Sequence, residues 1–266
     1  MTSRNQLLVR PWAVGVLLAL ALFSVACGPS EEEVRAAARA EEWAELQADH
    51  EALTALRQEM RGLLAAPAPP VEGEDGEPAE EGEPAENPRI AELRSEITAK
   101  ADAFAERLVN FINDNAGFEG EEPHPEVKGA IRLKSGEDIV LAQEYVDKGG
   151  DWAKAIEIIS SAMIVDPDNP ELAARLEEAE RMRYMDEERW AAVEKGMTED
   201  EVRAALGQVK HQNVRKYDDR GVTAWFYPKE GGAAAAVFFR ENKGVLKVYD
   251  LNFDAVKTAE ERAEEG

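Results

Sequence analysis

The residue types that most often carry out chemistry are few and far apart in this chain. Its three histidines are His50, His124 and His211, and no pair of them has the spacing of a metal site. No phosphate-binding loop, dinucleotide fingerprint or nucleophile elbow is present. Ser160 and Ser161 fall inside a predicted helix with no histidine nearby in sequence, so we interpret them as surface or packing positions. The sequence therefore predicts no enzyme, no metal site and no cofactor.

Carboxylates dominate the composition, with 55 acidic residues and a formal net charge of -24. Adjacent acids arise by chance at this density, so paired carboxylates do not indicate hydrolase chemistry. A strongly negative field disfavours nucleic acid and anionic lipid surfaces. A cationic partner and simple solubility both remain as reasons for the charge.

The first 26 residues have the layout of a signal peptide: Arg4 and Arg10 precede an apolar run over 12–26 that is too short to span a membrane. The only cysteine, Cys27, follows at once, and the sequence FSVACG over 23–28 resembles the lipobox of bacterial lipoproteins. This resemblance implies lipid on Cys27. The alternative is an ordinary secretory signal with an incidental cysteine.

Lipid on Cys27 would tether the protein stably, because each buried acyl methylene contributes about 0.8 kcal/mol. Gly28 stands where inner-membrane lipoproteins of enteric bacteria have Asp. We therefore expect attachment to the outer membrane, with the rest of the protein facing the periplasm.

Two helices are predicted on either side of a linker. A stalk over 27–66 starts with a capping box at Ser30 and carries an apolar stripe, and a second stripe predicts a helix over 89–115. Residues 67–88 are rich in Glu, Pro and Gly and predict a disordered linker. The stripes are compatible with an antiparallel hairpin, with a first helix standing alone, or with a coiled coil.

A helical region is predicted over 89–189. Within it, residues 136–170 read as helix, turn, helix and proline, with Gly150 at the turn, small Ala155 and Ala162 along the second helix, and Pro167 after it. This pattern resembles a tetratricopeptide repeat, followed by a helix from 171 to about 194. The family implies peptide or protein binding; plain helical scaffolding is the alternative.

From 190 to 254 the pattern changes to a short helix ending at Gly207 and four strands over 213–217, 222–228, 234–240 and 245–252, before an acidic tail at 255–266. The residues Gly196-Met197-Thr198, Leu206-Gly207, Trp225-Phe226-Tyr227 and Val237-Phe238-Phe239 resemble the SmpA/OmlA (BamE-like) outer-membrane lipoprotein domain. That resemblance implies a role in assembling β-barrel proteins. The whole chain is thus predicted to be α+β.

The predicted strand over 222–228 is apolar on both faces, so a sheet covered by helices on one side would expose an aromatic patch. Trp225, Tyr227 and Phe239 are the candidate partner-binding residues, with a core position as the alternative for Trp225. We expect a scaffold that binds envelope proteins, with barrel-assembly components as candidates. An acidic accessory subunit or inhibitor of one envelope enzyme or cell-wall factor is the alternative.

Overall fold

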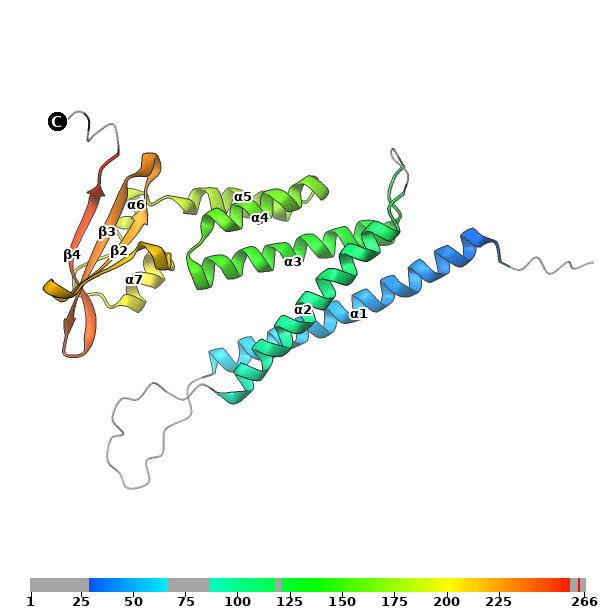
Figure 1. The fold of residues 1–266 in the computed structure, drawn as a ribbon, viewed down its shortest axis with the longest axis horizontal. Helices are drawn as coiled ribbons and strands as arrows, with labels where there is room; N and C mark the ends of the chain where they lie inside the picture. The colour runs from blue at the N-terminus through cyan, green and yellow to red at the C-terminus, as the bar shows by residue number, and fades with distance from the viewer. Residues whose placement is uncertain (1–28, 67–86, 118–120, 259–262, 264–266) are drawn as a thin grey trace, which may run out of the picture.

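The computed structural model describes residues 29–66, 87–117, 121–258 and 263. In this part of the chain, helices come first and a four-stranded antiparallel sheet follows, which confirms the predicted α+β class. A long helical hairpin, a group of three further helices and the sheet succeed one another along the molecule (Figure 1). The predicted signal peptide, Cys27, most of the linker and most of the acidic tail lie outside the described residues.

Helices α1 (Glu31–Ala65) and α2 (Pro88–Asp114) form an antiparallel hairpin, one of the arrangements that the stripes left open. The capping box is confirmed, because Ser30 Oγ accepts a hydrogen bond from the Glu33 amide and the Glu33 carboxylate accepts one from the Ser30 amide. The apolar stripes of the two helices face each other and bury a common core, which includes Leu46, Leu53, Leu93, Phe104, Leu108 and Phe111.

Three packed helices follow, namely α3 (Pro125–Gly149), α4 (Trp152–Val165) and α5 (Pro170–Arg183). Gly150 ends α3 in the left-handed conformation with φ of 61°, and the Asp151 carboxylate accepts from the Lys154 amide to begin α4. Ala155 and Ala162 are buried, as the tight approach of α4 to its neighbours requires.

Two helix boundaries differ from the prediction. Helix α3 begins at Pro125, well before residue 136, because Val127 and Ala130 are buried against the α1–α2 core. Helix α5 ends at Arg183 and does not continue to 194. After α5 ends, Met185 packs into the core beside the sheet. The Met185 amide donates a hydrogen bond to Pro228 O at 2.8 Å.

The C-terminal part is a meander with two short helices. Its strands lie in the order β1-β2-β3-β4, and every neighbouring pair is antiparallel. The capping box of Thr198 with Glu201 begins α7, as predicted. The bounds are α6 (Glu187–Trp190), α7 (Glu199–Leu206), β1 (Val214–Tyr217), β2 (Val222–Pro228), β3 (Ala234–Asn242) and β4 (Val245–Val256).

The last strand is longer than expected. It runs to Val256 and so takes in residues 255 and 256, which the sequence assigned to the acidic tail. Local contacts explain the extension: the Phe253 ring lies 5.8 Å from that of Trp190, and Lys229 pairs with Asp254 at 2.6 Å.

Candidate protein-binding groove

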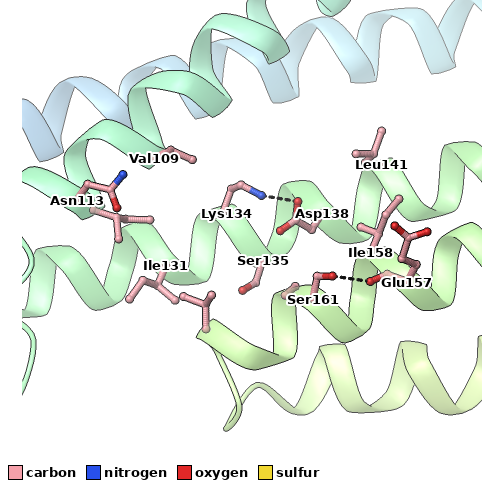
Figure 2. A pocket seen from close by; sticks show the side chains of 13 residues that line it. Val109, Asn113, Ile131, Lys134, Ser135, Asp138, Leu141, Glu157, Ile158 and Ser161 are labelled. Carbon is pink, nitrogen blue, oxygen red and sulfur yellow. Dashed lines mark hydrogen bonds and ion pairs between the residues drawn. The ribbon is translucent and has the colours of Figure 1, made fainter.

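A groove of about 420 Å³ runs between α2 and α4, with α3 as its floor (Figure 2). Its volume falls within the range of about 300–1,000 Å³ that is usual for ligand sites. Helix α2 contributes Val109, Ile112 and Asn113 to one wall, and α4 contributes the other wall. We call this feature the α2–α3–α4 groove. Its lining from α3 and α4 is Ile131, Lys134, Ser135, Asp138, Leu141, Glu157, Ile158, Ser161, Ala162 and Val165.

Three of the apolar side chains that line the groove are open to solvent. Val109 is 41 % exposed, Leu141 is 46 % exposed and Val165 is 60 % exposed. Ile164, next to Val165 at the end of α4, is 83 % exposed. Single exposed apolar residues are common, but residues gathered around one hollow indicate a place where a partner can bury them.

The polar groups on the floor bind one another. Lys134 pairs with Asp138 one helical turn away (Figure 2). The Ser135 hydroxyl is buried and donates to the Asp166 carboxylate at 2.9 Å, so it is a structural tie between α3 and the α4–α5 turn. The Asn169 amide and Arg132 also bind Asp166, at 2.8 and 3.1 Å. This network holds the end of α4 against the floor of the groove.

A second hollow, of about 230 Å³, continues along α3 toward the tip of the α1–α2 hairpin. It shares Lys134, Asp138 and Leu141 with the groove and adds residues of α2, Asp102 among them. The two hollows therefore form one path along α3.

Contacts between α1 and α3 fix the angle that opens this path. Gly129 of α3 lies against the Trp43 ring of α1, where an added Cβ would stand 2.6 Å from the nearest ring atom. The Arg57 guanidinium donates two hydrogen bonds to the Glu137 carboxylate, at 2.8 and 2.7 Å. Such paired bonds set direction as well as distance, so these contacts orient the hairpin relative to α3.

The turn between α3 and α4 also joins the helices to the sheet domain. A Cβ on Gly150 would stand 2.2 Å from Gln208 O, so the backbones meet closely here. Asp151 pairs with Lys210 at 2.6 Å. Burial raises the pKa of Asp151, but hydrogen bonds from Lys210 and from the Lys154 amide outweigh burial, and the pKa is lowered below its usual value.

Among the described residues, no group of three or more His, Cys, Asp or Glu side chains could hold a metal ion. None of the helices in the described ranges is long and apolar enough to cross a membrane. No protein-family model, no curated protein and no solved structure matches this chain.

The aromatic residues chosen from the sequence are core residues. Trp225 is 3 % exposed, Tyr227 is 5 % exposed and Phe239 is fully buried, and all three pack with α7 residues such as Val202 and Leu206. The assignment of these three as a partner-binding surface is therefore corrected. Cys27, the other predicted site residue, lies outside the described part of the chain.

The sheet does expose aromatic rings, but on its opposite face. Phe226 and Phe238 lie 6.5 Å apart between ring centroids, and Phe238 and Tyr249 lie 6.3 Å apart. The strand register places two arginines on the same face. We define the outer sheet face by Arg215, Tyr217, Phe226, Phe238, Arg240 and Tyr249.

The groove was not predicted from the sequence, although a signal for it was present. Ile158 and Val165 stand at helical spacing beside Ala155 and Ala162, and Ile164 lies on another side of α4, so the apolar surface of α4 is wide. A helix with a wide apolar surface needs partners on more than one side. The angle between α2 and α3 decides which part of the apolar surface of α4 stays open to solvent.

Proposed function

We propose that this chain is a non-enzymatic outer-membrane lipoprotein, facing the periplasm, that holds envelope proteins together. In this proposal the α2–α3–α4 groove receives an apolar helical segment of a partner protein. The observation that carries it is the set of open aliphatic side chains, Val109, Leu141 and Val165, around a hollow already lined by three helices.

A helix is the element that suits this hollow best. The groove lies between two helices that pack on a common third one, so an added helix would complete a layer beside α3. Recognition of this kind uses aliphatic side chains at helical spacing, set into a groove. The Lys134–Asp138 pair in the middle of the floor would favour a partner with a polar group at the matching turn.

The acidic side chains along the path indicate which charge the partner segment should carry. Asp102, Glu144 and Glu157 are exposed along it. Glu144 pairs with the exposed Lys148 and Glu157 with the half-buried Lys154, each within one helix, and such surface pairs stabilise by less than about 1 kcal/mol. They can therefore be exchanged for pairs with a partner. A segment with Lys or Arg beside its apolar stripe is the best match.

The proposed outer-membrane location and the proposed role in assembly are supported by the sequence. The lipobox-like residues before Cys27 support lipid attachment, and the likeness of the C-terminal part to SmpA/OmlA domains supports a place in outer-membrane assembly. A fold likeness alone does not carry a particular task. Barrel assembly is accordingly the first setting to test for the groove.

The groove can be tested by site-specific crosslinking in the native cells. A photo-crosslinking amino acid is placed at Leu141 or at Val165, and the matched control position is Val34, a similarly open valine on α1 at 52 % exposure. We expect the same partner to be captured from both groove positions and not from Val34. Sequencing the captured peptide should show an apolar helical stripe flanked by basic residues.

Equal capture from all three positions, or none from the groove, would contradict the proposal. The identity of a captured partner separates the two settings. Components of the barrel-assembly machinery would support the scaffold, whereas a single soluble enzyme would favour an accessory subunit or inhibitor.

A further inference from the structure

The second surface of interest is the outer sheet face, which is remote from the groove in sequence and does not depend on it. Phe226, Phe238 and Tyr249 form a row across β2, β3 and β4. Phe226 and Phe238 are partly exposed, and Tyr249 is 37 % exposed. Helix α7 packs on the other face, together with Trp225, Val237 and Phe239.

Two arginines flank this row. Arg215 lies opposite Ala224, which shares the face of Phe226, and Arg240 stands 4.4 Å from the centre of the Tyr249 ring. Within the described ranges neither arginine forms an ion pair with a carboxylate, although the chain as a whole is rich in acids. Arginines that are open to solvent beside aromatic rings can take up carboxylates with two parallel hydrogen bonds.

The sheet lacks the strong negative charge of the whole chain. Residues 214–256, from the start of β1 to the end of β4, contain seven Lys and Arg residues and six Asp and Glu residues, in a chain with a net charge of -24. Charges are screened beyond about 8 Å at physiological ionic strength. A short acidic segment would therefore respond to the local positive charge, whereas a long polyanion such as nucleic acid would meet the negative field of the rest.

We propose that the outer sheet face binds an acidic segment of a partner protein, one that places aromatic or aliphatic side chains on the row of rings and carboxylates on Arg215 and Arg240. The rings supply apolar contact area with a favoured edge-to-face geometry. The arginines supply direction and selectivity for acid. This partner segment has the opposite charge to the one proposed for the groove, so one chain would join two chemically different partners.

Selection from a library of random displayed peptides tests this proposal and does not require the natural partner to be identified first. The purified full chain is compared with the double variant Arg215→Glu, Arg240→Glu. We expect the chain to enrich peptides that combine Asp or Glu with aromatic or aliphatic residues. Such a peptide should bind the double variant at least about tenfold more weakly, because two charge-assisted contacts are lost.

The matched control is Lys216→Glu with Lys243→Glu, which changes the charge equally. Lys216 is on β1 but opposite Thr223, on the other face, and Lys243 is in the β3–β4 turn. This control should keep most of the affinity, whereas Tyr249→Ser, which preserves the charge, should reduce it. Thermal unfolding verifies that each variant is folded.

Three outcomes would overturn the proposal. They are the absence of any enriched acidic peptide, enrichment of basic peptides on this face, and equal weakening by the control pair. The last would show that net charge alone attracts the peptide.

Discussion

At the scale of single residues, Tyr227 has the clearest physical consequence. Its side chain is buried, and its hydroxyl lies 3.4 Å from Gly207 O. Burial raises the pKa of Tyr227 well above its ordinary value of 10.0, although Arg203 acts in the opposite sense. The phenol therefore remains neutral in the folded protein under conditions where it ionises in the unfolded chain.

This difference predicts the loss of stability at high pH. The contribution of Tyr227 is fully present below the unfolded pKa of about 10 and is lost as the pH rises toward the folded pKa. Above about pH 10 the free energy of unfolding should fall by up to roughly 1.4 kcal/mol per pH unit from this group alone. Urea unfolding at several pH values, compared with Tyr227→Phe, measures the difference. Parallel curves for the two proteins would contradict it.

The residue scale also shows why the binding surface of the sheet was assigned to the wrong face. Alternation along β2 separates Trp225 and Tyr227 from Phe226, and both sets are apolar. The pattern shows that the faces differ, but it does not show which of them α7 covers. That choice depends on how the loop after Gly207 returns to β1, which is a property of the whole domain.

At the scale of elements, the α3–α4 turn is the most sensitive connection. Gly150 has a positive φ, and its Cα hydrogen faces Gln208 O at a distance that leaves no room for a methyl group. Gly150→Ala should therefore lower the free energy of unfolding by about 2 kcal/mol or more, since backbone strain and a backbone clash add. Calorimetry or urea unfolding measures this cost.

Gly149→Ala is the matched control for this prediction. An added Cβ at Gly149 meets only the Asp151 Cβ, at 4.0 Å, and the residue is helical. The substitution should be neutral or slightly stabilising, because alanine is the better helix former. A similar loss of stability in both variants would mean that the close approach to Gln208 is not the cause.

The sequence predicts the positions of the helices well, but it does not predict the angles at which they pack. The capping boxes at Ser30 and Thr198 and the stripes of α1 and α2 are local patterns, and the structure confirms them. The groove instead depends on the angle between α2 and α3, which long-range contacts such as Arg57 with Glu137 determine. A contact between residues far apart in the sequence produces no periodic pattern of residue types, so the angle between α2 and α3 could not be predicted.

At the scale of the whole molecule, the proposed lipid anchor would decide where both surfaces operate. Cys27→Ser should move the protein from the membrane fraction to the soluble fraction, because no acyl chain would then hold it. Fractionation and immunoblotting measure this change, and Ser30→Ala serves as a control that leaves Cys27 intact. A wild-type protein that is already soluble would favour an ordinary secretory signal, and a Cys27→Ser protein that stays with the membrane would indicate another anchor.

Helix α1 begins only a few residues after Cys27, and this closeness would affect how a lipid-anchored form of the protein meets its partners. Helix α1 begins at Glu31, so only residues 28–30 separate it from Cys27, and three extended residues reach about 10 Å. With lipid on Cys27, this short connection would hold the first turn of α1 close to the surface of the bilayer. Encounters with other anchored proteins would then take place in two dimensions, at a high effective concentration. Under those conditions a partner with only weak affinity would still occupy the α2–α3–α4 groove or the outer sheet face for much of the time.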